Sequence, residues 1–354
     1  MRIFFSAKQL AHRPQQFMQA GRLVPHLEAP ERCERMSESL RRANYIVESP
    51  RDGIGLDAIK RVHESGYLEF LRTAWARWSA IKNAGPEILP NTHPYRGAGD
   101  DFAPRRTPRA ASPVAQANWY LGDLACPIGP HTWDAAVAAA HTALAAAEAV
   151  LAGEHAAYAL CRPPGHHAMA DRAGGFCYLN NAAIAAEFLL QHFTRVAILD
   201  VDTHHGDGTQ SIFYRRADVQ YVSVHVDPTN YYPFFSGYAD EYGAGDGEGY
   251  NLNLPLVPGS GDAEFLDALD EAVEAIRAHR SEALAVSVGF DAHARDPLSV
   301  LNVTNDGYRR IGDAIAALKV PTVLVQEGGY NLDLLGANVV AFIGGFNLAS
   351  RLSR

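Results

Sequence analysis

A run of polar residues begins at Asp200, directly after an apolar segment, and contains side chains suited to binding a metal ion. Residues two apart in extended chain point to the same side, so Asp202 and His204 can reach one ion, with Asp200 behind them. Asp291 follows a second apolar segment and could supply a third ligand. Two carboxylates and one imidazole leave positions open for water and substrate, which is typical of a catalytic site. The ligand set suits Zn²⁺, although Fe²⁺ and Mn²⁺ compete with it.

The sequence also contains groups that could move protons and stabilise negative charge beside such an ion. The adjacent histidines His166 and His167 are candidate general bases, and each requires a carboxylate that fixes its tautomer. Asp200 and Asp207 are candidates for that role. Tyr330 follows two glycines, and its phenol could donate a hydrogen bond to a developing oxyanion. Any one of these residues could instead belong to a turn, a helix cap or the core, but together they favour metal-assisted hydrolysis.

These groups follow apolar segments typical of buried strands, and helical patterns separate the strands. We expect strands at 157–161, 196–199, 219–224, 284–288 and 320–326, and helices at 132–152, 262–279 and 306–319. Strands that alternate with helices of about ten or more residues form a parallel sheet, whose ligand site lies outside the carboxyl ends of the strands. The sequence therefore predicts a single α/β domain over residues 1–354, with helices on both faces of a central, mostly parallel sheet.

Residues 85–117 interrupt this pattern, because they contain several glycines and prolines and show little apolar periodicity. We expect a long loop here, with charged residues that include Asp100 and Asp101. Long ordered loops in compact enzymes are often functional, although a surface insertion has the same composition.

Composition excludes several classes of function. The 354 residues carry a net charge of −9, which argues against a general affinity for nucleic acid. The N-terminus lacks a signal-peptide pattern, and no stretch approaches the ~20 uninterrupted apolar residues of a membrane span. Polar residues also interrupt the alanine-rich run 135–152, which we interpret as a soluble helix. We therefore expect a cytoplasmic protein without membrane contact.

The four cysteines and four of the other histidines are expected to have no catalytic role. The cysteines are far apart and form no CxxC pair, so we expect buried, reduced thiols at Cys33, Cys126, Cys161 and Cys177. Four histidines have no evident partner in the sequence and are expected to be structural or solvated: His141, His155, His192 and His279.

The polar segments resemble the superfamily of histone deacetylases and acetylpolyamine amidohydrolases, which has an arginase-like, three-layer α/β/α fold. The matching motifs are RPPGHHA at 162–168, GGFCYLNNAA at 174–183, DVDTHHGDGTQ at 200–210, SVGFDAHARDP at 287–297 and EGGY at 327–330. The resemblance runs over nearly the whole chain, in order and in spacing. It implies a zinc-dependent hydrolysis of an N-acetyl amide that releases acetate and a free amine.

The resemblance implies a role for each matching residue. The residues that match the zinc ligands are Asp202, His204 and Asp291. The residues that match the water-activating and amine-protonating pair and its carboxylate partners are His166, His167, Asp200 and Asp207. Tyr330 matches the tyrosine that polarises the acetyl carbonyl. The residues that match the walls of the substrate channel are Phe176, Tyr232 and Gly175. A structural potassium ion is implied at Asp200, Asp202, His204, Ser223 and Val224.

Within this superfamily, the N-terminal half is similar to the bacterial acetylpolyamine amidohydrolases, through residues 62–71, 73–78 and 129–133. In that branch, a loop at the position of 85–117 narrows the channel and contributes to a dimer. The resemblance therefore implies a homodimer and a small, cationic, acetylated amine as substrate, such as acetylputrescine or acetylcadaverine.

The chain departs from that branch where an acidic residue is expected to hold the distal ammonium group of the substrate. Ala125 stands at the position of the expected glutamate, and Phe176 stands where the branch carries tyrosine. Asp123 could substitute for the glutamate, as could Asp100 or Asp101. These differences bear on the chain length and charge that the channel accepts.

Three other functions compete with this interpretation. The first is a protein or peptide acetyl-lysine deacetylase with the same chemistry. The second is a manganese ureohydrolase of the arginase type, which would need a further aspartate at position 295, where this chain has Arg295. The third is a metal-binding protein that has lost catalysis, against which the intact His166, His167 and Tyr330 argue.

Overall fold

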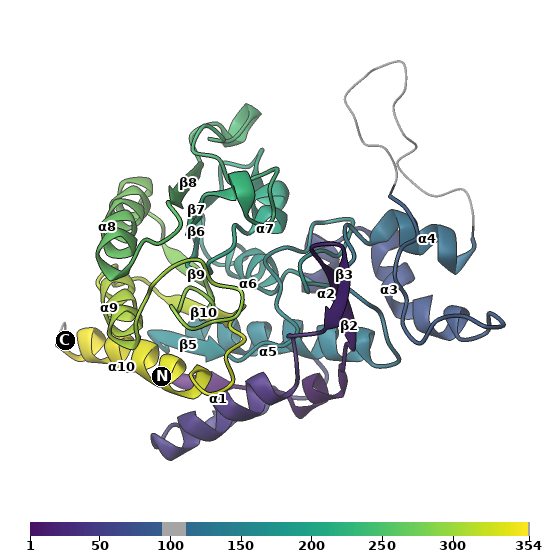
Figure 1. The fold of residues 1–354 in the computed structure, drawn as a ribbon. Coiled ribbons are helices and arrows are strands. Elements are labelled where there is room, and N and C mark those ends of the chain that lie inside the picture. The colour runs from purple at the N-terminus through teal and green to yellow at the C-terminus, as the bar shows by residue number, and fades with distance from the viewer. Residues whose placement is uncertain (94–110, 353–354) are drawn as a thin grey trace.

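An eight-stranded sheet forms the centre of the protein (Figure 1). The computed structural model describes residues 1–93 and 111–352. The strands are β1 (Arg2–Phe4), β4 (Val47–Glu48), β5 (Ala156–Ala159), β6 (Val196–Asp200), β7 (Val219–Val226), β8 (Asn251–Leu256), β9 (Ala283–Val288) and β10 (Thr322–Gln326). They follow the order β4-β1-β5-β10-β9-β6-β7-β8, and each neighbouring pair runs parallel. The expected parallel sheet is thereby confirmed.

Five of these strands agree with the sequence-based prediction, with ends that differ by one or two residues. The other three lack the continuous apolar run from which a buried strand is predicted. Strands β1 and β4 are only three and two residues long. Strand β8 lies at the edge of the sheet and alternates Asn and Leu before Pro255, so it resembles a half-buried segment.

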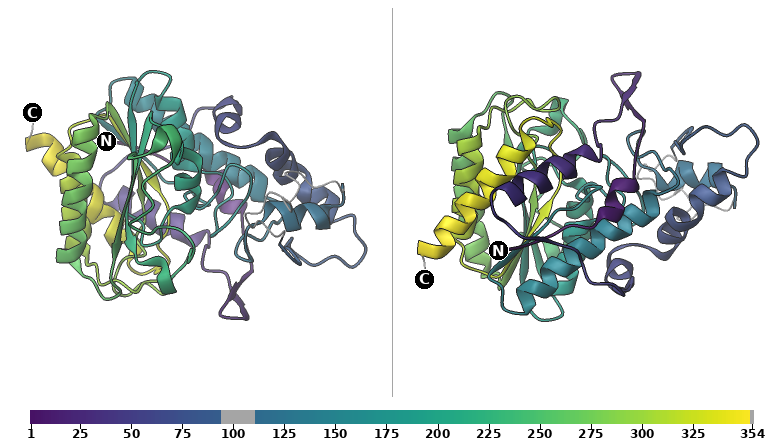
Figure 2. Two further views of the ribbon diagram at one scale, coloured as in Figure 1. Left: turned by 90° about the horizontal axis from the view of Figure 1, so that it is seen from above. Right: turned by 90° about the horizontal axis from the view of Figure 1, so that it is seen from below.

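Helices cover both faces of the sheet, which gives the three-layer α/β/α arrangement (Figure 2). One face is covered by α5 (Thr132–Leu151) and α6 (Asn181–Leu189), which join one buried apolar cluster. The other face is covered by α1 (Glu31–Arg42), α8 (Asp262–His279), α9 (Asn305–Ala316) and α10 (Leu335–Leu352), which form a second cluster. Because both faces are covered, the central strands are buried on both sides.

The remaining elements lie around this core. They are the hairpin of β2 (Gln16–Gln19) and β3 (Arg22–Pro25), the helices α2 (Asp57–Val62), α3 (Ser65–Trp78), α4 (Pro113–Tyr120) and α7 (Asp207–Phe213), and the 3₁₀ turns η1 (Ala7–Ala11), η3 (Pro228–Asn230) and η4 (Gly245–Gly247). Helices α3 and α4 contact each other and project away from the sheet (Figures 1 and 2).

The prediction of a continuous loop over 85–117 is wrong at its C-terminal end, where α4 begins at Pro113. Ser112 is the N-cap residue and Pro113 the first helical residue, a combination that favours a helix start. The short apolar pattern of α4 becomes stable because it packs on α3. Asp100 and Asp101 lie outside the described residues.

Helix α5 is the one described helix with the length and hydropathy of a membrane span, yet 72% of that apolar stretch is buried inside the protein. It is therefore a core helix, as expected for the alanine-rich run. The helix begins at Thr132, and its N-cap residue is His131. The Thr132 hydroxyl oxygen accepts a hydrogen bond from Gly129 N at 2.8 Å. The four cysteines are free and buried, as predicted.

Candidate active site

Four neighbouring strands, β5, β10, β9 and β6, end where the four polar segments begin. Since carboxyl ends of parallel strands meet at one edge of a sheet, this order brings the segments together. Asp200, at the end of β6, pairs with Ser287 of β9 on one side and with Ser223 of β7 on the other. The sheet order, which the sequence does not specify, is thus what assembles the site.

Asp202, His204 and Asp291 form a buried cluster whose candidate ligand atoms all lie within 4.8 Å of one another. His204 Nδ1 lies 3.2 Å from Asp202 Oδ1 and 3.2 Å from Asp291 Oδ2. Asp291 Oδ2 is buried and has no hydrogen-bond partner. A buried carboxylate oxygen without a partner is costly, and a cation would satisfy it. The cluster therefore fits a metal ion, as the sequence predicts.

The electrostatics of this cluster also favour a cation. Burial and the nearby Asp202 carboxylate raise the pKa of Asp291 to about 7, since two carboxylates in one site resist ionising together. Burial disfavours a charge on His204, but the closeness of the Asp202 and Asp291 carboxylates outweighs this and raises the pKa of His204 to about 9. A bound cation would favour ionised carboxylates and a neutral imidazole instead.

Gly328 lets the backbone after β10 pass close to both carboxylates. A Cβ atom at this position would lie 2.1 Å from Asp291 Oδ2 and 2.6 Å from Asp202 Oδ2. Both distances are far below the ~3.5 Å at which nonbonded atoms rest. The Gly328 N–H instead donates a hydrogen bond to Asp202 Oδ2 at 2.8 Å. Glycine at this position is therefore required by the ligand cluster.

The adjacent histidines each have the carboxylate partner that the sequence predicts. His166 Nδ1 lies 3.0 Å from Asp200 Oδ2, and His167 Nδ1 lies 2.7 Å from Asp207 Oδ1. The two ring centroids are 4.0 Å apart. His166 Nε2 lies 3.9 Å from Asp202 Oδ1, so the pair borders the ligand cluster. The carboxylates leave the Nε2 atoms of both rings available for proton transfer.

Burial by itself lowers the pKa of both histidines, but the charged groups around them differ. For His166, the Asp200 and Asp202 carboxylates outweigh burial and raise the pKa well above its ordinary value. For His167, burial and the nearby His166 lower the pKa well below its ordinary value. Burial raises the pKa of Asp207 to about 7. The different surroundings of the two histidines thus move their pKa values in opposite directions.

Tyr330 lies in a loop that an N-terminal arginine supports. The Arg32 guanidinium lies 4.7 Å from the centroid of the Tyr330 ring, and it donates hydrogen bonds to the carbonyl oxygens of Glu327 and Gly329. Asp296 accepts a hydrogen bond from Tyr330 N at 2.6 Å. Burial raises the pKa of Tyr330 well above its ordinary value, so the phenol keeps its proton and can donate a hydrogen bond to an oxyanion.

Phe176 and Tyr232, the predicted channel walls, lie against the candidate catalytic residues Tyr330 and His167. The Phe176 ring meets Tyr330 edge to face with centroids 5.6 Å apart. The Tyr232 ring meets His167 in the same way at 4.9 Å. Gly175 is close to His167 as well, because a Cβ atom there would lie 2.3 Å from the imidazole Cδ2. These contacts place the predicted channel residues beside the histidine pair and the tyrosine.

Asp123, predicted to bind a distal ammonium group, has a carboxylate that already accepts three hydrogen bonds. Their donors are Ala125 N, Gly175 N and the Tyr232 hydroxyl, each at 2.8 Å. Ala125, at the position of the expected glutamate, packs against the small apolar cluster that contains Phe176. The structure therefore places Asp123 beside the predicted channel residues, where it accepts hydrogen bonds from Gly175 and Tyr232.

Several residues of the site are not indicated by the sequence motifs. Tyr231 stacks on His204 with centroids 4.9 Å apart and an interplanar angle of 14°. Phe17 and His26 support Phe176 from behind, at centroid distances of 5.1 and 4.5 Å. The run of aromatic residues at 231–235 could have indicated Tyr231, whereas Phe17 and His26 carry no signal in the sequence.

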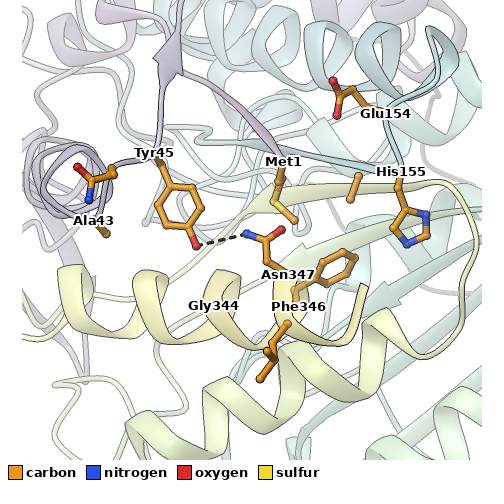
Figure 3. Close-up of a pocket in the computed structure, with 11 residues that line it drawn as sticks. Met1, Ala43, Tyr45, Glu154, His155, Gly344, Phe346 and Asn347 are labelled. Carbon is orange, nitrogen blue, oxygen red and sulfur yellow. Dashed lines mark hydrogen bonds between the residues drawn. The ribbon is translucent and has the colours of Figure 1, made fainter. Parts of the chain in front are cut away.

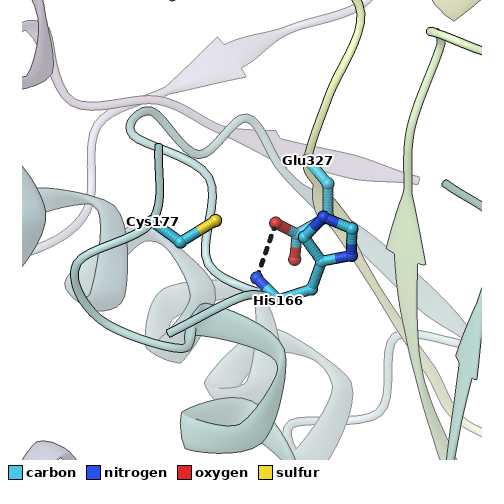
Figure 4. Close-up of side chains that lie close together, drawn as sticks. All are labelled: His166, Cys177 and Glu327. Atoms are coloured by element: carbon cyan, nitrogen blue, oxygen red, sulfur yellow. Dashed lines mark hydrogen bonds between the residues drawn. The ribbon is translucent and has the colours of Figure 1, made fainter. Parts of the chain in front are cut away.

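A second group of potential ligands, His166, Cys177 and Glu327, lies nearby (Figure 4). The Glu327 carboxylate already accepts hydrogen bonds from Gly165 N at 2.6 Å, His166 N at 3.1 Å and the Ser287 hydroxyl at 3.1 Å. Burial raises the pKa of the Cys177 thiol well above its ordinary value, so it stays protonated. This group therefore supports the histidine loop and does not fit a metal ion.

The arginase-type alternative is not supported by the residues around Asp291. His293 Nδ1 accepts a hydrogen bond from Arg295 N at 3.1 Å, and Asp296 binds the Tyr330 loop. Over residues 1–93 and 111–352, the cluster around Asp291 therefore contains three ligands and lacks the further carboxylates of a dinuclear site.

Two other sequence-based expectations concern positions outside this site. His141 and His279 do have partners, since His141 Nε2 lies 3.2 Å from Gly55 O and His279 Nδ1 lies 2.7 Å from Ser281 Oγ. These contacts agree with a structural role.

A cavity of about 670 Å³ lies beside the start of β5, between α1 and α10 (Figure 3). Two of its polar side chains, Tyr45 and Asn347, bond to each other at 3.3 Å. The amino ends of the strands are at this edge, whereas ligand sites of parallel α/β sheets lie at the carboxyl ends. The cavity is therefore separate from the catalytic groups.

Comparison with known proteins agrees with this geometry. A family model described as the histone deacetylase domain matches residues 26–346. The chain is 48% identical to an acetylpolyamine amidohydrolase of Burkholderia pseudomallei, over 98% of each chain. It is 43% identical to acetylpolyamine amidohydrolase 1 of Pseudomonas aeruginosa, over 94% of each chain. The fold matches a crystal structure of the acetylpolyamine aminohydrolase from B. pseudomallei with a TM-score of 0.93, at 46% identity over 99% of both chains.

Proposed function

Because the chain belongs to the histone deacetylase family and is a deacetylase, we propose that it removes the acetyl group from acetylated polyamines in a zinc-dependent hydrolysis. The products are acetate and a free amine, and acetylputrescine and acetylcadaverine are the expected substrates. The observation that carries this proposal is the convergence of the Asp202, His204 and Asp291 cluster with the histidine pair.

The proposed mechanism assigns each side chain a separate task. Asp202, His204 and Asp291 would hold a metal ion, and a bound ion would supply Lewis-acid polarisation of the acetyl carbonyl and activation of water. One histidine of the pair His166 and His167 takes the proton from water, and a histidine returns a proton to the leaving amine. Their carboxylate partners keep Nε2 of each ring facing the reaction.

Tyr330 and the channel walls complete the mechanism. The protonated Tyr330 phenol donates a hydrogen bond to the carbonyl oxygen as that oxygen becomes negative. Phe176 and Tyr232 hold the chain of the acetylated amine between them, beside the histidines and the tyrosine.

A polyamine substrate is supported by the two acetylpolyamine amidohydrolases, since the chain matches them over nearly their whole length. The competing substrate is an acetylated lysine in a protein or peptide, which the same chemistry would hydrolyse. Ala125, in place of a glutamate that would hold the distal ammonium, is the observation that favours this alternative.

We also propose a structural potassium ion, a homodimer and a cytoplasmic location. Asp200 lies beside Ser223 in the sheet register, and Val224 follows, so β7 offers oxygen atoms next to the turn that holds Asp202 and His204. The dimer would be tested by the molecular mass in solution, and the potassium ion by the dependence of thermal stability on K⁺ compared with Na⁺.

Acetate release from acetylputrescine, acetylcadaverine and an acetyl-lysine peptide tests the proposed function. We expect higher kcat/KM for the acetylpolyamines, loss of activity with a chelator, and recovery with Zn²⁺ in preference to Mn²⁺. An Asp291→Asn variant should lose both metal and activity. Asp313→Asn, on the exposed side of α9, is the matched control and should retain both. Preference for the peptide would overturn the polyamine assignment, and activity that survives metal removal would overturn the metal mechanism.

A further inference from the structure

The Asp123 carboxylate joins three segments beside the predicted substrate channel. Its Oδ1 atom accepts a hydrogen bond from Ala125 N, and its Oδ2 atom accepts hydrogen bonds from Gly175 N and from the Tyr232 hydroxyl. Each of the three bonds is 2.8 Å long. A carboxylate has about four acceptor positions, so three are already occupied. Asp123 therefore has little remaining capacity to bind an ammonium group.

Two of the three donors belong to the segments of the two predicted channel walls. Gly175 precedes Phe176, whose ring contacts Tyr330. Tyr232 comes from the segment after β7, and its ring contacts His167. The Tyr232 hydroxyl also lies close to the first wall, 3.5 Å from the place where a Cβ atom of Gly174 would be. The Asp123 carboxylate thus connects the Phe176 side to the Tyr232 side.

The backbone around Asp123 is itself fixed to the Phe176 side. Gly122 N donates a hydrogen bond to Ala173 O at 2.7 Å, and Ala173 N donates to Tyr120 O at 2.9 Å. Asp123 consequently moves with that wall, and its bond to the hydroxyl restrains Tyr232. Hydrogen bonds to a charged acceptor are stronger than neutral ones, so this restraint is substantial.

Resting on the proposed function, we propose that Asp123 is a positioning residue that sets the width of the channel by holding Tyr232 at a fixed distance from the Gly175–Phe176 wall. A channel of fixed, narrow width admits a slender, unbranched acetylated amine and excludes an acetyl-lysine flanked by peptide. Selectivity then comes from the restraint of Tyr232, and no ion pair between Asp123 and the distal ammonium is needed.

The conservative substitution Tyr232→Phe tests this proposal, because it removes the hydroxyl and keeps the ring. The matched control is Tyr242→Phe, on the same segment, whose side chain is exposed. Three substrates are compared: acetylputrescine, the neutral N-pentylacetamide of the same length, and an acetyl-lysine peptide. We expect Tyr232→Phe to shift the ratio of kcat/KM about tenfold toward the peptide, as for the loss of one hydrogen bond to a charged group. The control should leave the ratio unchanged.

The neutral substrate distinguishes positioning from ion pairing. If Asp123 acts on the channel width, Asp123→Ala and Tyr232→Phe change the kinetics of acetylputrescine and N-pentylacetamide alike, and the double variant is no worse than Asp123→Ala. If Asp123 binds the ammonium group, Asp123→Ala raises KM for acetylputrescine alone, and the proposal is overturned. An unchanged ratio in a folded, active Tyr232→Phe variant overturns it as well. Should Asp123→Ala fail to fold, Tyr232→Phe alone decides.

These outcomes are separate from those of the proposed function. The change in the ratio of kcat/KM values is measured relative to the parent protein. It can therefore be determined whichever substrate the parent protein prefers. A parent protein that prefers the peptide refutes the polyamine assignment, whereas a Tyr232→Phe ratio equal to that of the parent refutes the role of Asp123.

Discussion

His167 and Asp207 are joined by a 2.7 Å contact between Nδ1 and Oδ1, and Asp207 is the first residue of helix α7. The helix fixes the carboxylate, and the carboxylate fixes the tautomer and orientation of the ring. Only the Nε2 atom of His167 then remains for the proposed proton transfer, so its geometry depends on Asp207.

Asp207→Asn should therefore lower kcat by about 10- to 100-fold, the usual cost of removing an orienting partner. KM should change little, because Asp207 does not line the channel. Steady-state kinetics with acetylputrescine would measure both. Asp306→Asn, an exposed substitution on α9, is the control. A wild-type kcat in the Asp207→Asn variant would show that His167 does not need this partner.

Gly328→Ala should abolish metal binding while leaving the fold intact. The added methyl group would overlap the Asp291 and Asp202 carboxylates, at 2.1 and 2.6 Å from their Oδ2 atoms. Metal content after dialysis, compared with the far-ultraviolet circular dichroism spectrum, separates the two effects. Gly55→Ala is the matched control, because a Cβ atom there meets nothing within 4 Å. Full metal occupancy in Gly328→Ala would contradict the ligand geometry.

Tyr330→Phe should reduce kcat by about 10²- to 10³-fold, as for the loss of one oxyanion donor. The ring stays in place between Arg32 and Phe176, so the change in stability should be small. Thermal unfolding and kinetics with acetylcadaverine would check both expectations. Arg32→Met would remove the support of the loop and should lower stability as well as kcat. If Tyr330→Phe keeps the parent kcat, the phenol is not the oxyanion donor.

The contribution of His63 to the stability of the protein should fall as the pH drops from 7 to 5. His63 Nε2 accepts a hydrogen bond from Asn180 N at 2.9 Å, so the folded protein requires a neutral ring, and burial lowers the pKa of His63 to about 4. The unfolded chain binds this proton near its ordinary pKa of about 6.5. The stabilisation is therefore complete above that value and is lost as the pH falls toward the folded pKa, by up to ~1.4 kcal/mol per pH unit.

Urea unfolding at pH 7, 6 and 5 measures this effect. His63→Gln should be less stable than the parent at pH 7, and its stability should fall less steeply with acid, because one proton-binding group is missing. Equal slopes for the two proteins would mean that His63 does not bind a proton on unfolding. The free energy of unfolding of the variant should still depend on pH, because two other buried histidines, His12 and His225, also have lowered pKa values.

Much of the active site can be predicted from the sequence, because its residues are contiguous with the strands that position them. Asp200 ends β6, Asp202 and His204 follow directly, and Tyr330 follows β10, so each motif carries its own local geometry. The parallel sheet can then be inferred from the alternation of strands and helices alone. The order in which the strands pair is a property of the whole chain and is not encoded in any one motif.

The supporting residues show what local sequence leaves undetermined. Arg32 and Phe17 belong to an N-terminal segment with no chemical motif, and they reach the site only after the chain has folded. Asp123 could be identified as an acid near the channel, but its three donors come from three separate positions. Similarly, α4 begins with Ser112 and Pro113, yet its stability depends on contact with α3.

The hydrogen bonds from Arg32 to the carbonyl oxygens of Glu327 and Gly329 span 295 and 297 residues of sequence. On the ribosome, residues 327–330 are synthesised long after the segment that supports them. A nascent chain that ends before this point can contain Asp202, His204 and Asp291 but lacks the loop that carries Tyr330. The candidate site can therefore be completed only after the C-terminal region that carries Tyr330 has been synthesised and has closed onto the segment that contains Arg32.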